Sequence, residues 1–194
     1  MKAKKIVIVL LFIVTITISY LLLSKNNQKL ENLPVEKIKG SMVYDMSTKE
    51  KSIGAVDNVF VAKINNIVKT VYDENDIPST IYEIEVIENI KGNIPSNKTI
   101  ELTQKGGLNK DQKSYTFYEN AYLLEEGQEY IILAFVPFNN GDLVIHNEHT
   151  YIKLDNNSIS KKNSINIVDQ YKEAYKNQII PSSKVDNFKS KYEV

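Results

Sequence analysis

An alternation of apolar and acidic side chains between Thr80 and Ile90 restricts the fold of this chain more than any other feature. Every second side chain in part of this segment is apolar, at Tyr82, Ile84 and Val86, and glutamates stand between them. Side chains alternate between the two faces of a β-strand, so the apolar residues share one face and the glutamates the other. A register slip by one residue would bury the glutamates, and the pattern therefore predicts a strand with one buried face.

Three further segments are rich in Ile, Val, Tyr and Thr and are separated by turn residues: Val59–Val68, Lys98–Thr103 and Glu129–Val136. This composition is typical of β-strands. Glu129–Val136 is apolar on both faces, so we expect it to be the most buried strand. Two short strands, Asp142–Ile145 and Thr150–Leu154, should follow as a hairpin with a tight turn. The sequence thus predicts a mainly β fold, a small OB-like β-barrel or sandwich.

Helices are expected on both sides of these strands in the sequence. Ser47 can cap a short helix before the first strand, with Glu50 completing a capping box. Near the C-terminus, Ser164–Ile179 predicts an amphipathic helix that lies on the β domain. Its apolar residues recur at spacings of three and four, at Ile165, Val168, Tyr171, Tyr175 and Ile179. Pro181 should end this helix, and we expect the last dozen residues to fray.

The N-terminal part of the chain carries a candidate membrane segment. Ile6–Leu23 is a run of eighteen uncharged, mostly apolar residues, and it is preceded by lysines at positions 2, 4 and 5. A bilayer core of ~30 Å requires roughly 20 helical residues, with a range of about 17–25. The run can therefore span the membrane as a signal-anchor. The lysines in front of it place the N-terminus in the cytoplasm and the following domain outside the cell membrane.

A cleaved signal peptide is the alternative interpretation. Small residues must precede a cleavage site, and Thr17-Ile18-Ser19 is a passable match. Cleavage there would leave an apolar new terminus beginning at Tyr20, so we favour the uncleaved single-pass anchor on the length of the run. In the alternative the domain is secreted, and both interpretations export it.

These features divide the chain into four expected parts. Residues 1–23 hold the cytoplasmic lysines and the transmembrane signal-anchor, and the polar residues 24–46 form a stalk. Residues 47–160 form the β-barrel domain, and residues 161–194 form the C-terminal helix and tail. A chain of 194 residues has room for one such domain and its anchor.

Composition excludes several classes of function. The chain has 24 basic and 24 acidic residues, and all of the basic residues are lysine. Without arginine or a basic tract, no nucleic-acid-binding surface is expected. Cysteine is absent, which excludes disulfides, thiolate metal sites and a cysteine nucleophile. The abundance of Lys, Asn and Ile suits an AT-rich bacterial genome.

One candidate ligand-binding group is aromatic. Four rings are close together in the sequence, at Tyr115, Phe117, Tyr118 and Tyr122. They could form a stacking platform for a sugar or a peptide. Because Tyr and Phe are also ordinary residues of sheets and cores, a purely structural role is the competing interpretation.

The two histidines of the chain form a second candidate group, His146 and His149 with Glu148 between them. Two histidines and a carboxylate can bind zinc, and an open fourth position would allow hydrolysis. The metal-binding pair of a helix has a spacing of i, i+4. Here the spacing is i, i+3 at an expected turn, and the third ligand is unspecified, so the pattern favours a plain turn.

Four segments together resemble netrin-like modules, which are also called tissue-inhibitor-of-metalloproteinase-like modules: Ala55–Lys63, Tyr82–Gly92, Ile100–Leu102 and Leu124–Leu133. The shared pattern is a strand after an Ala-x-Asp-like helix end, a strand that closes in Lys-Gly, and a Gly-x-x-Tyr entry to the buried strand. The resemblance implies an OB-type barrel in an extracytoplasmic setting. Inhibition in that family relies on an N-terminal cysteine that chelates the zinc of the enzyme. This chain has no cysteine, so the resemblance carries over neither that activity nor any functional residue.

The sequence therefore predicts a membrane-anchored, extracytoplasmic interaction module that binds a protein, peptide or cell-wall ligand without a cofactor. Residues 6–23 contact the membrane. Two alternatives remain: a metal-dependent hydrolase that uses His146 and His149, and a structural subunit of a membrane complex. In the second alternative, the anchor helix and Ser164–Ile179 provide the contacts.

Overall fold

The computed structural model describes residues 33–40, 43–137, 140–154, 160–184 and 188–194. The chain forms two compact units, Met1–Pro34 and Val35–Val194, and the elements described here belong to the second. The predicted anchor, residues 6–23, lies outside the described residues. No helix in the described ranges is long and apolar enough to cross a membrane.

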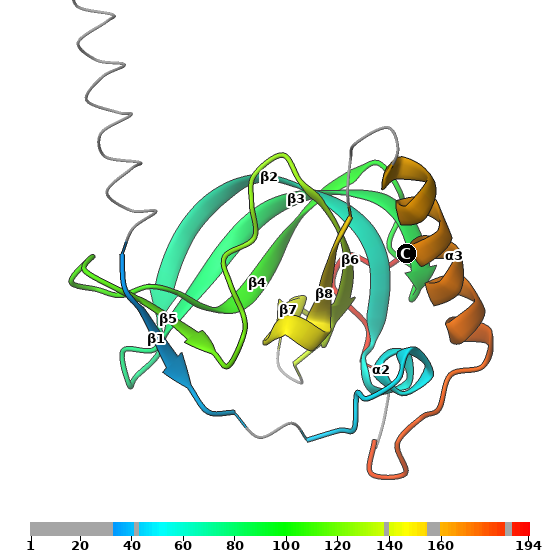
Figure 1. Ribbon diagram of the computed structural model, residues 1–194, viewed down its shortest axis with the longest axis horizontal. Coiled ribbons are helices and arrows are strands. Elements are labelled where there is room, and N and C mark those ends of the chain that lie inside the picture. Colours follow the sequence, from blue (N-terminus) through cyan, green and yellow to red (C-terminus); the bar gives the residue numbers. More distant parts are fainter. Residues whose placement is uncertain (1–32, 41–42, 138–139, 155–159, 185–187) are drawn as a thin grey trace, which may run out of the picture. The chain divides into compact units, whose positions relative to one another are not determined.

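The second unit is mainly β, as the sequence predicts, and its described strands form one sheet that curls into a half-barrel (Figure 1). Seven strands follow one hydrogen-bonded path, in the order β1 (Val35–Ile38), β5 (Tyr115–Tyr118), β4 (Lys98–Leu108), β3 (Pro78–Lys91), β2 (Asn58–Tyr72), β6 (Glu129–Ala134) and β8 (Tyr151–Leu154). β1 comes from the segment that we expect to be stalk, and it pairs in parallel with β5. This part of residues 24–46 thus belongs to the sheet.

The eighth strand, β7 (Val144–Ile145), connects two parts of the curled sheet. Val144 pairs in parallel with Thr103 of β4, and it also bridges to Phe135, which directly follows β6. The N–H of Phe135 donates to the carbonyl of Val144 and the N–H of Val144 donates back, both at 2.9 Å. β7 therefore lies between β4 and the end of β6.

The predicted hairpin of the two short strands is wrong. β7 pairs with β4, whereas β8 pairs with β6, and the short 3-10 helix η1 (Glu148–Thr150) joins them. Asn147 caps this turn by accepting the N–H of His149 at 3.1 Å, and the hydroxyl of Thr150 donates to the carbonyl of Asn147 at 2.6 Å. This capped turn leads the chain from β7, beside β4, to β8 at the edge of the sheet, which a two-residue hairpin loop would not do.

The alternating segment forms β3 as predicted, and its three apolar residues are fully buried. β2 and β3 are longer than expected, because the carboxylate of Asp73 accepts the N–H groups of Asn75 and Ile77 at 2.9 and 3.0 Å and tightens their loop. β4 also continues beyond Thr103, through Gly106 and Gly107. An added Cβ on Gly106 would lie 2.5 Å from the Phe117 ring, so only glycine allows β5 to pack there.

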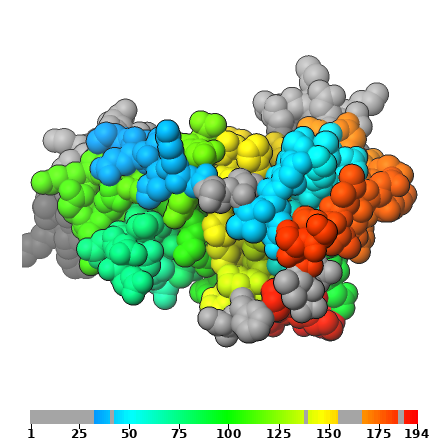
Figure 2. Space-filling model, turned by 90° about the horizontal axis from the view of Figure 1, so that it is seen from below, coloured from blue at the N-terminus to red at the C-terminus, as the bar shows by residue number. Residues whose placement is uncertain are grey.

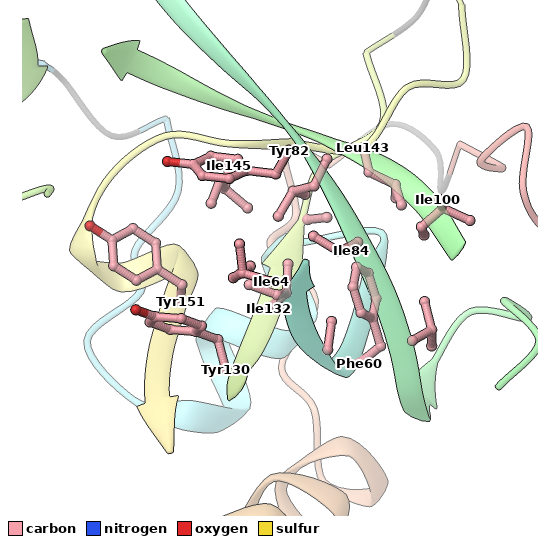
Figure 3. Close-up of a cluster of buried hydrophobic side chains, with 14 of the residues drawn as sticks. Phe60, Ile64, Tyr82, Ile84, Ile100, Tyr130, Ile132, Leu143, Ile145 and Tyr151 are labelled. Atoms are coloured by element: carbon pink, nitrogen blue, oxygen red, sulfur yellow. The ribbon is translucent and has the colours of Figure 1, made fainter. Parts of the chain in front are cut away.

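Two hydrophobic clusters occupy the two faces of the sheet. The inner cluster contains the side chains that alternate inward along β2, β3, β4 and β6 (Figure 3). The hydroxyl of Tyr82, which is fully buried in this cluster, donates to the side-chain oxygen of Gln104 at 2.7 Å and accepts the N–H of Leu124 at 3.1 Å. The predicted burial of Glu129–Val136 is confirmed, since five of the six residues of β6 are buried.

Two helices cover the outer cluster: α2 (Lys49–Ala55) and α3 (Ser160–Lys176). The predicted cap of the first helix is wrong by one residue, because the Thr48 hydroxyl accepts the N–H of Lys51 at 3.3 Å. The C-terminal helix is confirmed, and its apolar face is buried on the sheet at Val168, Tyr171 and Ala174.

The C-terminal tail differs from the expectation of a frayed end. Phe188 and Tyr192 pack against the inner cluster, and the N–H of Val194 donates to the carbonyl of Asn93 at 3.3 Å. The Nζ of Lys191 also lies 2.6 Å from Asp142. The described part of the tail is therefore part of the fold.

Gly54→Ala should destabilise the protein, because an added Cβ would lie 1.9 Å from the carbonyl oxygen of Ile179. We expect the free energy of unfolding to fall by about 2 kcal/mol in urea titrations, despite the better helix propensity of alanine. The N–H of Ile179 donates to Glu50, so its hydrogen exchange should accelerate. Gly127→Ala is the control for a loss of stability without this clash, since nothing lies within 4 Å of its added Cβ and its positive φ of 79° alone strains alanine. Equal acceleration of Ile179 exchange in both variants would contradict this account.

Candidate functional site

A pocket of about 720 Å³ lies where the ends of β6 and β7 meet the segment that precedes α2. Figure 2 shows this side of the molecule, with the residues around β7 in yellow between β4 and β5 in green and α2 in cyan. Much of its wall is apolar, formed by Val43, Tyr44, Met46, Phe135, Pro137 and Phe188. The volume and the mostly apolar lining are those of a typical small-ligand site.

A buried ion pair forms part of the pocket wall. Oδ1 of Asp57 lies 3.0 Å from Nζ of Lys184, and the two side chains are only 5% and 6% exposed. Oδ2 of Asp57 accepts the N–H of Val136 at 2.8 Å, which fixes the chain after β6. Lys184 also donates to the carbonyls of Ala55 and Val56, at 3.0 and 2.8 Å. The pair therefore holds the end of α2, the start of β2 and the end of β6 together.

A second buried lysine reaches the same helix end. Nζ of Lys91 donates to the carbonyls of Ile53 and Val56, both at 2.7 Å. The last carbonyls of a helix have no partner within the helix, so these lysines supply the missing donors. Burial, and then the charge of Lys184, lower the pKa of Lys91 to about 8, while Asp57 acts in the opposite direction.

Lys105 and His146 contribute the remaining basic groups of the pocket. Lys105 is half-buried on β4, and it makes no ion pair with a carboxylate in the described part of the chain. The His146 ring packs edge-on against Phe135, with the ring centroids 5.7 Å apart. Burial, and then the charge of Lys105, lower the pKa of His146, which favours the neutral form of this imidazole.

The structure separates the four aromatic residues that the sequence singles out. Tyr115 stacks on Phe117 at a centroid distance of 6.0 Å, and Phe117 is buried below Lys37. Tyr122 packs edge-on against Tyr151 at 5.1 Å and is 42% exposed. Tyr118 alone of the four lines the pocket. The group is thus not one platform.

The histidine group is also divided. His146 lines the pocket, whereas His149 is exposed on η1, with Nε2 3.8 Å from Oε1 of Glu148. Oε1 of Glu148 also accepts the side-chain N–H of Asn120 at 3.1 Å. In the described ranges, no group of three His, Asp or Glu residues is placed to hold a metal ion. Of His146, Glu148 and His149, His146 is the one that lines the pocket.

Sequence reasoning missed the charged residues of the pocket. Asp57 stands in a helix-to-strand junction that the sequence singles out, but Lys105 and Lys184 look like ordinary surface lysines. Neither belongs to a motif, and they lie about eighty positions apart in the chain. Only the folding of the C-terminal tail against α2 brings Lys184 to Asp57.

No protein-family model matches the chain, and no curated protein matches it. The site has to be interpreted from its own geometry.

The lowered pKa of Lys91 predicts a dependence of stability on pH. Between about pH 8 and the ordinary lysine pKa of 10.5, the unfolded chain keeps this proton and the folded chain releases it. The unfolded state then binds more protons, so the contribution of Lys91 to the unfolding free energy increases with pH. Urea titrations of the wild type and Lys91→Met from pH 7.5 to 9.5 test this. The stability difference between the two should change in favour of the wild type as pH rises, and a constant difference would contradict the assignment.

Proposed function

We propose that this protein is a membrane-anchored, extracytoplasmic binding module whose pocket takes a small ligand or a short peptide segment, without chemistry of its own. The pocket of about 720 Å³ carries this proposal, because its mostly apolar wall contains a few polar groups in fixed positions. Fixed polar groups in an apolar pocket orient a ligand and provide specificity. The sequence suggests a protein, a peptide or a cell-wall ligand. The size of the pocket favours a ligand no larger than a small molecule or a short peptide segment.

An OB-type barrel is the architecture that we propose for the domain. β2, β3 and β4 pair antiparallel in chain order, β6 pairs with β2, and β7 joins β4 to the residue after β6. This order of five strands supports a partly open Greek-key barrel. OB barrels bind ligands through one strand face and the neighbouring loops, and Tyr118, the last residue of β5, lines the pocket. The resemblance of the sequence to netrin-like modules implies the same architecture, and we include it in this proposal.

Anchoring in the cell membrane is proposed from the apolar run Ile6–Leu23 and the lysines before it. The domain would then be held at the outer surface by residues 24–34. A tethered domain needs only a modest affinity for a ligand at the same surface, because tethering raises the effective concentration.

The absence of cysteine allows a direct test of this topology. Lys69→Cys places a single thiol at an exposed position of β2, and Lys2→Cys places one before the apolar run. A membrane-impermeant maleimide added to intact cells should label the first variant, and it should label the second only after permeabilisation. The reverse pattern would show that the domain is cytoplasmic. Release of labelled protein into the medium would support the secreted alternative.

The two histidines allow a test of pocket occupancy, because His146 lines the pocket and His149 does not. In the full chain held in lipid nanodiscs and labelled with ¹³C-histidine, neutral 3-phenylpropanol should shift the His146 signal and leave the His149 signal in place. Tyr118→Ala should weaken this binding by roughly fivefold through loss of aromatic contact. Tyr122→Ala is the matched control outside the pocket.

A His146 signal that does not respond to 3-phenylpropanol would overturn the pocket as the binding site. An equal loss of affinity in Tyr118→Ala and Tyr122→Ala would show that the compound binds elsewhere and acts on His146 indirectly.

A further inference from the structure

The shape of the apolar wall favours a ligand with a flat, apolar body. Tyr44 and Phe135 lie nearly parallel, with ring centroids 6.5 Å apart and an interplanar angle of 22°. Phe188 and Met46 also line the pocket. Aromatic rings bind other rings in offset-stacked or edge-on arrangements at centroid distances of about 4.5–7 Å.

The charges at the pocket favour an anion. Three lysines contribute, since Lys105 and Lys184 line it and Lys91 reaches the same helix end as Lys184. Two acidic residues oppose them. Asp57 is already paired with Lys184, and Glu119 is exposed at the edge of the pocket, where water screens its charge.

Of the two lysines among the described residues that line the pocket, Lys105 is the one without an ion-pair partner. It is half-buried and makes no ion pair with a carboxylate among the residues that the structure describes. An ammonium that is partly buried is less well solvated by water, so an anion that binds directly to it stabilises it. The neutral ring of His146 lines the same pocket and can donate one N–H to an anionic oxygen.

The number of donors separates a carboxylate from a phosphate. Phosphate sites are typically built from helix N-termini, glycine-rich loops or several arginines. This chain has no arginine, and the α-helix end near this pocket is the C-terminal end of α2. One ammonium and one imidazole N–H match the two oxygens of a carboxylate.

We propose that the pocket binds a carboxylate attached to a flat apolar body, with Lys105 as the ion-pair partner and the aromatic wall around the body. This inference rests on the proposed function and names the chemical class of its ligand. A free aromatic acid and the C-terminal carboxylate of a peptide that ends in an aromatic residue share this chemistry.

The experiment uses the full chain in lipid nanodiscs, labelled with ¹³C-histidine, and follows the His146 signal with His149 as the internal reference. The probes are 3-phenylpropionate, neutral 3-phenylpropanol, cationic 3-phenylpropylamine and 2-phenylethyl phosphate. The carboxylate should bind about tenfold more tightly than the alcohol, which is the size expected of one charge-assisted hydrogen bond. A second arm compares N-acetyl-valyl-phenylalanine with its C-terminal amide and distinguishes a peptide end from a free acid.

Substitutions at Lys105 test the assigned partner. Lys105→Gln should weaken 3-phenylpropionate binding by about tenfold and 3-phenylpropanol binding by much less, because the alcohol carries no charge. Lys105→Glu should reverse the preference, so that 3-phenylpropylamine binds more tightly than the acid. Lys69→Gln removes an exposed lysine outside the pocket and should change neither affinity. Binding of the alcohol by the Lys105 variants shows that they keep the pocket intact.

Each contrary result has a distinct meaning. If 3-phenylpropanol binds and the acid binds no more tightly, the carboxylate inference fails and the proposed function stands. If no probe shifts His146, both fail. Tighter binding of the phosphate ester than of the acid would overturn the choice of carboxylate, and equal affinities in wild type and Lys105→Gln would overturn the role of Lys105.

Discussion

The first five residues of β2, Asn58–Ala62, are buried on both faces, and this constraint determines much of the remaining structure. Phe60 and Ala62 belong to the inner cluster, whereas Val59 and Val61 belong to the outer cluster. The same residues pair with β3 on one side and with β6 on the other. A strand that is surrounded in this way cannot change its register without moving polar groups into an apolar core. The inner cluster fills the inner face of the curled sheet, and α2 and α3 cover the outer cluster on its other face.

The charged cluster at the end of α2 connects this core to the pocket. Asp57 is the residue before β2, and its backbone N–H donates to the carbonyl of Ala134 while its carboxylate accepts the N–H of Val136. Lys184 and Lys91 bind the carbonyls at the end of the helix. A buried ion pair adds little to stability, because the cost of removing the two charges from water offsets their attraction. It does constrain the geometry, because each buried charge needs its partner in one position. The cluster therefore fixes the pocket wall more than it strengthens the fold.

Local patterns predicted the elements of this fold better than they predicted the pairing of those elements. The alternation at Tyr82, Ile84 and Val86 predicted β3 correctly, because the period of a strand is visible in a few residues. The spacing in Ser164–Ile179 predicted α3, although the helix ends at Lys176. The hairpin prediction for β7 and β8 was wrong, because neighbouring short strands can pair with distant strands instead.

The candidate site was predicted only in part. Tyr118 and His146 belong to groups that the sequence singles out, and both line the pocket. Their expected partners do not line it: Phe117 is buried and stacks on Tyr115, and His149 is on the exposed turn. The sequence did not indicate that Lys105 belongs to the site, because a single lysine on a strand has the same sequence pattern whether or not a pocket forms beside it. Residue type alone does not indicate which side chains meet.

The sequence by itself determined the mainly β character of the chain, the buried face of β3 and the amphipathic C-terminal helix, because each follows from the periodicity of side chains along a short segment. It also excluded functions that require a cysteine thiol or an arginine guanidinium, because the chain contains neither residue. The tertiary structure alone decided that Asp57 meets Lys184, that the tail packs on the core, and that Lys105, His146 and Phe135 line one pocket. These contacts join residues that are far apart in the chain, and they depend on how the sheet curls, which no local pattern encodes.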